Sequence, residues 1–377
     1  MKEKEIKVKT RELVKNLSHR IELATGIVPL IIDEKSTVRI FRLLKKDKKL
    51  GTVLSQEELF DEASFLSSLI TVKKLNPLQR KEAIKKRIEE LKSAKEYIGY
   101  VLLDGLHDLP LGTKIGNLEI IDKQSLGDQF KYFNNQTEKF GADTNSSFAK
   151  ITFKAHRMIG AEKILVDELE LPFAILSLIF EFEMNPRNIS AILWYPNNWP
   201  QYLEPYSKRS GWVVFKDAVH QKPLELLSKI STSKSKNELQ KRIIRSLKIF
   251  GISRATNITE LRFIPIIAAI EALLLQETDR ETLGMKFAQK ITVILGKNFS
   301  NYRTRYLAFK EYKKLYVLRS KFIHDGKNID KHSLELLNNI FYSLIIKISG
   351  LSNKLHCIDD LDNFINEKLF GKLYSAD

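Results

Sequence analysis

The sequence predicts an α+β protein, in which a mixed α/β N-terminal region (1–227) precedes an all-α bundle of about five helices (236–350). Two observations predict this division. Short runs of β-branched and aromatic residues, bounded by turn residues, are confined to the first part of the chain. Apolar residues spaced three or four apart fill the second part, in segments that begin at capping residues. The polar and basic stretch between them, SKISTSKSK, predicts a linker over 228–235.

The N-terminal region is expected to begin with a β-hairpin. Residues 26–32 and 37–44 are short apolar runs separated by four polar residues, which is typical of two strands joined by a turn. From about residue 55 to residue 100 the apolar spacing becomes helical, interrupted near Asn76 and Pro77. This part is therefore expected to be helical up to about residue 100.

Residues 101–227 are expected to contain strands, loops and one long helix. Turn signals dominate 101–146, where a sub-boundary of the region could fall. Alternating apolar residues predict a strand at 147–156, and a helix is expected at about 161–179. Further strands are expected at 191–195 and 212–215. The loop over 194–206 is rich in Trp and Tyr, which could form a ligand platform but more commonly pack in a core.

The bundle is predicted from five pairs of helix start and stop signals. The expected helices run from a Ser235–Glu238 capping box to Phe250, closed by Gly251; from Asn257 to about Gln276, kinked or restarted at Pro265; from Thr278 to Gly296; from Ser300 to Asp325; and from Asp330 to Gly350. Their short connections make them neighbours in one bundle. The tail over 351–377 is expected to contain one short helix.

The charge of the chain is concentrated in the bundle. The 377 residues carry a formal net charge of +16, and residues 221–350 hold 24 Lys and Arg against 11 Asp and Glu. Such an excess is expected of a protein with a polyanionic partner, although a solvated basic surface that keeps the protein soluble would give the same count.

Several classes of protein are excluded by composition and motif. The single cysteine, Cys357, excludes an internal disulfide framework and a thiolate-rich zinc site. No GxxxxGK[ST], GxGxxG or HExxH motif is present. The N-terminal MKEKEIKVKT has no apolar secretory core, and the longest apolar runs fall short of the ~18–20 residues of a membrane span. We therefore expect a cytoplasmic protein with no membrane partner, no cofactor and no metal.

The fourth expected helix carries the residues with the most informative chemistry. Its apolar stripe is expected to comprise Tyr302, Tyr306, Phe309, Tyr316 and Ile323. Arg319 falls within that stripe, where an arginine is costly unless its guanidinium is paired. Ser320 and His324 are four residues apart and share an adjacent face at the helix end, with Lys321 and Lys327 nearby.

The spacing of Arg319 and His324 is also compatible with purely structural roles for both side chains. A histidine in the last helical turn commonly interacts with the C-terminal carbonyls, and an arginine in a stripe commonly pairs with a buried carboxylate. Glu271, in the apolar run of the second bundle helix, is the expected carboxylate.

Residues 318–326, LRSKFIHDG, resemble the Arg-x4–6-His signature of HEPN domains (higher eukaryotes and prokaryotes nucleotide-binding). Three further features resemble the ApeA-like branch of that superfamily: the segment RIIRSLKIFG at 242–251, the segment at 262–275 with its internal Glu271, and Tyr316 three residues before the arginine. The resemblance covers about 236–350. It departs from the pattern at Ser320, where many active members have Asn, Asp or His.

The resemblance implies a metal-independent endoribonuclease whose active site forms across a homodimer of the bundle. It implies that His324 acts as general acid or base, that Arg319 stabilises the transition state, and that Ser320 orients the histidine or holds a phosphate oxygen. Lys321 and Lys327 are expected to bind RNA, and Glu271 to have a structural, orienting role. The products would be a 2′,3′-cyclic phosphate and a 5′-hydroxyl.

The resemblance also implies an antiphage or abortive-infection toxin, whose N-terminal region would respond to a phage-derived or other trigger. Two alternatives remain open. A non-catalytic HEPN module that binds RNA, a nucleotide or a partner protein is favoured by Ser320. A basic DNA-binding regulator is disfavoured, because no helix-turn-helix spacing is present.

Helix geometry gives a reason to expect a dimer that does not depend on the family. Arg319 and His324 are ~140° apart on an ideal helix, so a two-fold axis would be needed to bring both to one phosphate.

Overall fold

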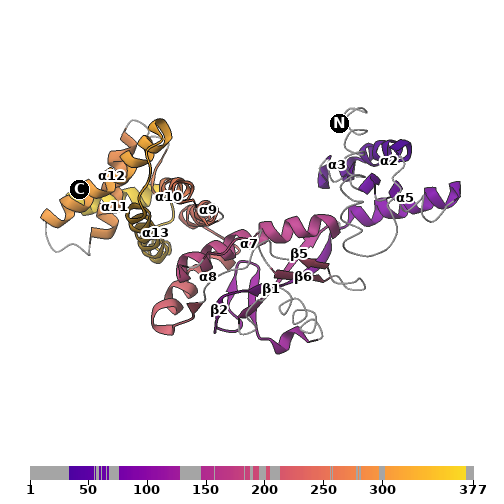
Figure 1. The fold of residues 1–377 in the computed structure, drawn as a ribbon, viewed down its shortest axis with the longest axis horizontal. Helices are drawn as coiled ribbons and strands as arrows, with labels where there is room; N and C mark the ends of the chain where they lie inside the picture. The colour runs from indigo at the N-terminus through magenta and orange to yellow at the C-terminus, as the bar shows by residue number, and fades with distance from the viewer. Residues whose placement is uncertain are drawn as a thin grey trace, which may run out of the picture. The chain divides into compact units, whose positions relative to one another are not determined.

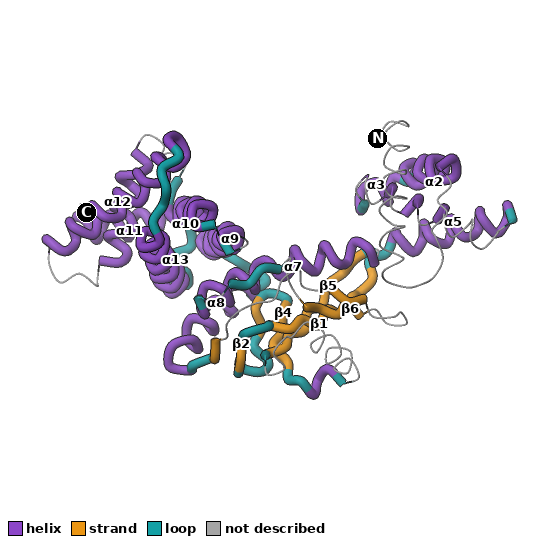
Figure 2. Tube along the Cα trace, viewed as in Figure 1, coloured by secondary structure: helices purple, strands orange, loops and turns teal. Residues whose placement is uncertain are grey.

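The structure is a computed structural model, and it divides into two compact units (Figures 1 and 2). The first comprises Met1–Tyr97 and Lys154–Ile164, and the second Ile98–Phe153 and Leu165–Asp377. The residues described are 34–54, 56, 59–60, 62–64, 66–67, 76–127, 146–156, 158–181, 183–186, 190–194, 201–203, 213–254, 256, 258–276, 279, 282–296 and 302–370.

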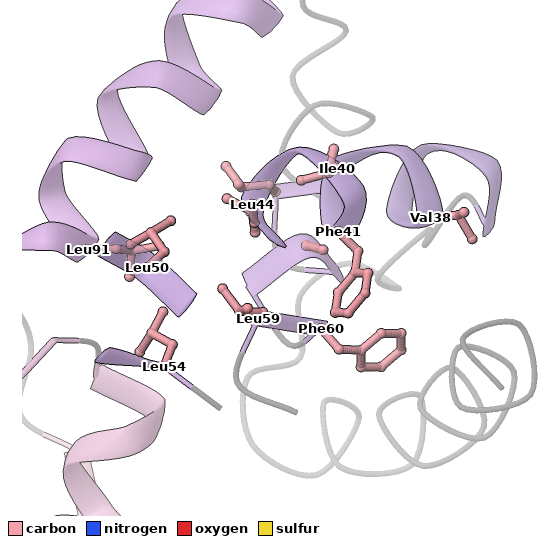
Figure 3. Packing of buried hydrophobic residues seen from close by; sticks show 11 residues of the cluster. Val38, Ile40, Phe41, Leu44, Leu50, Leu54, Leu59, Phe60 and Leu91 are labelled. Carbon is pink, nitrogen blue, oxygen red and sulfur yellow. The ribbon is translucent and has the colours of Figure 1, made fainter. Parts of the chain in front are cut away.

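The first unit is built from helices around one apolar core. It contains α2 (Glu34–Lys46), α3 (Lys48–Val53) and α5 (Pro77–Lys92), and Asn76 begins α5 with a capping box to Gln79. The core of this unit, shown in Figure 3, is formed by Val38, Ile40, Phe41, Leu44, Leu50, Leu54, Leu59, Phe60, Ala63, Leu66 and Leu91. Glu62 is buried beside this core and accepts two hydrogen bonds from Arg87, from Nε at 3.0 Å and Nη2 at 3.1 Å.

The expected N-terminal hairpin is wrong in its second strand. Residues 37–44 lie in α2, because Val38, Phe41 and Leu44 are spaced three apart and all three are buried on one side of a helix. The first expected strand, 26–32, lies outside the described residues. The segment expected to be helical up to about residue 100 ends earlier than expected, since α5 ends at Lys92 and a strand begins at Lys95.

The second unit contains a mainly antiparallel sheet with the strand order β3-β4-β5-β1-β6-β7. Its strands are β1 (Lys95–Leu103), β3 (Lys114–Ile115), β4 (Leu118–Ile121), β5 (Ser147–Ala155), β6 (Ser190–Trp194) and β7 (Gln201–Leu203), with the ends of β1 and β5 assigned to the first unit. The pairings β1–β6, β3–β4, β4–β5 and β6–β7 are antiparallel, and Leu118 lies opposite Ile151. A separate parallel pair joins β2 (Leu106–His107) to β8 (Val213–Val214).

The strands expected at 147–156, 191–195 and 212–215 are confirmed by β5, β6 and β8. The long helix is confirmed as α7 (Met158–Phe180), which packs on the sheet at Gly99. A Cβ at Gly99 would lie 2.9 Å from a methyl group of Leu165 and 2.9 Å from one of Ile151, so glycine lets helix and strand approach here without displacing these side chains. The side chains of the aromatic loop over 194–206 lie outside the described residues.

The expected linker was too long at its start. Helix α8 (Lys222–Thr232) includes 228–232, because Leu224, Leu227 and Ile230 form an apolar stripe that is buried. The Ser231 hydroxyl accepts a hydrogen bond from the Gly116 amide at 3.0 Å, which anchors this turn of α8 to the β3–β4 connection. The connection to the bundle is therefore restricted to residues 233–237.

The five-helix bundle is confirmed, and a sixth helix follows it (Figure 1). The helices are α9 (Glu238–Ser253), α10 (Thr259–Leu274), α11 (Leu283–Leu295), α12 (Tyr302–Asp325), α13 (Lys331–Leu351) and, in the tail as expected, α14 (Ile358–Phe370). Helix α10 is central and packs against α9, α11, α12 and α13. By length and composition α13 could also cross a membrane, but it contacts four other helices and eight of its residues are buried.

The helix ends agree with the expected signals in some places and differ in others. Asp330 caps α13 as expected, and α12 ends at Asp325, directly before Gly326, which has a φ of 65°. The capping box of α9 is formed by Asn237 with Gln240, two residues later than the expected box of Ser235 with Glu238. Gly251 lies inside α9, where a Cβ would approach Ala174 of α7 to 3.1 Å. The expected caps Asn257, Thr278 and Ser300 lie outside the described residues.

The expected apolar stripe of α12 is wrong. Its buried residues are Ala308, Tyr312 and Leu315, whereas Tyr302 is 81 % exposed and Ile323 is 49 % exposed. Every residue from Tyr302 to Leu307 is exposed, so the first turns of the helix project beyond the core. Burial of α12 therefore begins only at Ala308.

Candidate functional site

The site begins with a tyrosine that joins three helices of the bundle. Tyr316 on α12 donates its hydroxyl to Glu271 Oε1 on α10 at 2.8 Å. Its ring lies 5.2 Å from the ring of Phe287 on α11, and Gly284 lets α11 come close, since a Cβ there would lie 2.9 Å from the tyrosine ring. Burial raises the pKa of Tyr316 to about 12, and the Glu271 carboxylate adds to this effect. The tyrosine is therefore held protonated as a donor.

Arg319 lies one turn further along α12 and is half-buried. Its Cζ lies 5.7 Å from the centre of the Tyr316 ring, within the range of a cation–π contact. The structure differs here from the expectation that Glu271 pairs with the arginine, because that carboxylate accepts from Tyr316 instead. Among the described residues no carboxylate lies within 4.0 Å of the guanidinium, so its donors can meet an anion.

Ser320 and His324 lie on another side of α12. Ser320 is partly buried and His324 is exposed in the last turn, where the Gly326 amide donates to the Phe322 carbonyl at 3.0 Å. Because α12 stays helical to Asp325, the separation of five positions between Arg319 and His324 places them ~140° apart around the helix axis. The structure brings Ser320 and His324 to one face of α12, but it does not bring His324 to Arg319 within one chain.

Lys321 and Lys327 both line a groove between α12 and the start of α13. The groove has a volume of about 710 Å³. It contains four further cationic or titratable side chains, Lys310, Lys313, Lys314 and His332, against one acidic residue, Glu311. We call this feature the α12 groove. The Lys327 amide also donates to the Lys321 carbonyl at 3.4 Å, so the turn after the helix brings the backbones of these two residues together.

The sequence interpretation missed two parts of this site. Tyr316 is visible in the sequence as a member of the expected stripe, three residues before Arg319, but its bond to Glu271 depends on a packing of α10 and α12 that spacing does not reveal. The lysines at 310, 313 and 314 were missed although the signal is present, since Lys310, Lys314 and Lys321 recur at helical spacing. Within the described part of the chain no three His, Cys, Asp or Glu side chains gather as a metal site.

Comparison of the chain with protein-family models, with curated proteins and with solved structures finds no match.

Proposed function

We propose that this chain is a HEPN-type endoribonuclease that cleaves RNA without a metal ion. The observation that carries the proposal is the arrangement at the end of α12. A half-buried arginine, with no carboxylate partner among the described residues, precedes an exposed histidine in the last helical turn. In the proposal the arginine binds the phosphate that is attacked, and the Glu271–Tyr316 pair positions the ring that packs beneath it.

The proposed chemistry uses the nucleophile that RNA carries itself. The ribose 2′-oxygen attacks the adjacent phosphorus, the bond to the 5′-oxygen breaks, and the products are a 2′,3′-cyclic phosphate and a 5′-hydroxyl. His324 carries out one of the two proton transfers, removal of the 2′-OH proton or protonation of the leaving 5′-oxygen, since imidazole can do either near neutral pH, and solvent water carries out the other. Arg319 donates to the non-bridging oxygens, whose negative charge grows in the transition state. Ser320, one residue beyond Arg319, orients the histidine or donates to a phosphate oxygen.

The angle between Arg319 and His324 makes a homodimer part of the proposal. Two copies of α12 that meet at a two-fold axis would surround one phosphate with an arginine from one chain and a histidine from the other.

A direct test of the shared site mixes two inactive variants, Arg319→Ala and His324→Ala. A shared site restores part of the activity in the mixed dimer, whereas two sites that each lie within one chain stay inactive.

The function itself is tested with purified full-length protein and 5′-labelled single-stranded RNA, with and without EDTA. We expect cleavage in both conditions and a cyclic phosphate at the new 3′ end. RNA with every 2′-oxygen methylated is the control and stays intact, because it lacks the nucleophile. Binding of RNA without cleavage contradicts the proposal and supports the second candidate, a non-catalytic binding module, for which Ser320 after the arginine is the specific observation.

A further inference from the structure

The exposed side of α12 carries an aromatic pair that the proposed reaction does not use. The rings of Tyr302 and Tyr306 are stacked, with centroids 6.2 Å apart and planes 7° from parallel. Tyr302 is 81 % exposed and Tyr306 is 45 % exposed, so both rings lie largely in solvent. Exposed aromatic rings of this kind are the surfaces on which unpaired bases stack in single-strand-binding proteins.

A lysine connects the aromatic pair to the α12 groove. Lys310 Nζ lies 4.5 Å from the centre of the Tyr306 ring, and the same side chain lines the groove. The positions 302, 306, 310, 313, 317, 321 and 324 are spaced three or four apart and therefore share one side of the helix. The tyrosines thus lie on the same side as Lys321 and His324.

The groove carries positive charge that the described part of the chain does not neutralise. Five lysines line it, at 310, 313, 314, 321 and 327, and none of the ion pairs found among the described residues involves them. Five unpaired cations beside one glutamate repel one another, and a chain of phosphates relieves that repulsion. Charge alone would suit an acidic peptide equally well, but a peptide of Asp and Glu has no aromatic ring to stack on the two parallel tyrosines.

We infer that the exposed side of α12 binds single-stranded RNA, with unpaired bases on Tyr302 and Tyr306 and phosphates along the α12 groove. The inference rests on the proposed function, since it gives the substrate of that site as an unpaired strand. The distance along the helix from Tyr306 to His324 is ~27 Å, for 18 residues at ~1.5 Å each. Such a length suits a strand of several nucleotides, within the ~4–16 that single-strand-binding domains cover.

The test measures the affinity of the full-length protein for a labelled RNA of about 12 nucleotides, in the ~4–16 range of such sites. Every ribose of this probe is 2′-O-methylated, so that it binds without being cleaved. The groove variant is Lys314→Gln with Lys321→Gln. Its matched control, Lys234→Gln with Lys241→Gln, removes the same charge from exposed lysines outside the groove. We expect the groove variant to bind at least about tenfold more weakly, and its slope of log affinity against log salt to decrease by ~1.4, for two contacts at ~0.7 each.

The aromatic pair is tested separately from the charge. Replacing Tyr302 and Tyr306 by alanine should weaken binding about tenfold or more and leave the salt slope unchanged, because stacking releases no counterions. Replacing both by phenylalanine keeps the rings and should preserve affinity. Duplex RNA of the same sequence should bind the alanine and wild-type proteins equally, since its bases are already stacked.

Three results would overturn the inference: a groove variant no weaker than its control, alanine variants that bind as wild type, or poly-glutamate that competes as well as RNA of equal charge. The outcome is separable from the proposed function. A protein that binds the methylated probe through this surface and leaves unmodified RNA intact is no nuclease but retains the surface. A protein that cleaves RNA equally well with and without the groove lysines is a nuclease that binds its substrate elsewhere.

Discussion

Two cations on neighbouring helices of the bundle have opposite surroundings. Lys290 on α11 has a side chain only 5 % exposed, and its Nζ donates to the Leu274 carbonyl at 3.0 Å, to Asp279 at 3.1 Å and to Asp362. Arg319 on α12 is half-buried and has an aromatic ring beside it but no carboxylate within 4.0 Å among the described residues. Carboxylates of the protein neutralise the first charge, and none of the described residues neutralises the second in this way.

The surroundings of the two cations indicate different roles. Lys290, enclosed by carboxylates, is a structural cation, whereas Arg319 suits an anionic ligand. Asp362 belongs to α14, and Gln276 after α10 donates to both Asp359 and Asp362, so the Lys290 cluster attaches the C-terminal helix to α10 and α11. A half-buried guanidinium with unused donors does not stabilise the bundle in this way. Its donors are instead available to a phosphate. The comparison predicts that substitutions at the two places change different properties of the protein.

The largest expected effect is on catalysis. His324→Ala should reduce RNA cleavage by ~10²–10⁴-fold, the usual contribution of a general acid or base. The free energy of unfolding should change by no more than ~0.5 kcal/mol, because the side chain is exposed and makes no described bond. Cleavage rates and urea denaturation measure the two properties. More than about a tenth of the wild-type rate would exclude His324 from proton transfer.

The second effect is on stability. Lys290→Met should lower the free energy of unfolding by ~3–5 kcal/mol, because it leaves two carboxylates without their buried partner. Lys286→Met is the matched control, one turn earlier on α11 and exposed, and should cost ~0.5 kcal/mol or less. Below its melting temperature the Lys290 variant should still cleave RNA. Equal destabilisation by both variants would show that the Lys290 cluster does not stabilise the bundle.

The third effect tests the support beneath Arg319. Tyr316→Phe keeps the ring under the guanidinium but removes the donor to Glu271, and should cost ~1–3 kcal/mol for a carboxylate left unpaired. Tyr312→Phe is the matched control, since Tyr312 is buried in the same helix without a described hydrogen bond. Thermal denaturation of both variants measures the difference. A smaller loss in the Tyr316 variant would mean that its bond to Glu271 is not stabilising.

The parts of the fold that could be predicted are those set by local signals. Asp330, Gly326 and the apolar periodicity define the bundle helices because capping and amphipathicity act within a few residues. The region over 37–44 was misread because β-branched Val38 and Ile40 suit a strand as well as a helix, and burial decided in favour of the helix.

The candidate site could be predicted in its residues but not in its contacts. Arg319, Ser320 and His324 are visible as a motif, and their order on α12 follows from helical geometry. The choice of Tyr316 over Arg319 as the partner of Glu271 depends on how α10 and α12 pack. The Lys290 cluster joins residues 279, 290 and 362, which are separated by up to 83 positions, so no local pattern indicates it.

The smallest expected effect is the pH dependence of the Lys290 cluster. Burial alone would raise the pKa of Asp279, but the hydrogen bonds from the Gln276 amide and from Lys290 outweigh it, and the pKa lies below its ordinary value. Because the unfolded chain binds this proton more readily, Asp279 stabilises the protein above its ordinary pKa of ~3.9. That contribution is lost as the pH falls below ~4 and through the lower folded-state pKa.

Asp279→Asn should therefore make the stability less dependent on pH below ~4, while at pH 7 it should be less stable than wild type. Other carboxylates with lowered pKa values, such as Asp330 and Asp360, add to the acid sensitivity of both proteins, so the difference between the two curves is the quantity to measure. Urea denaturation at a series of pH values from 7 to about 3 gives this difference, on either side of the ordinary carboxyl pKa. His324→Ala, as the control, should run parallel to wild type over the acid range, since His324 makes no described bond to these carboxylates. If Asp279→Asn also follows the wild-type slope, Asp279 does not hold its charge through Lys290, and the contrast between the two cations loses its electrostatic basis.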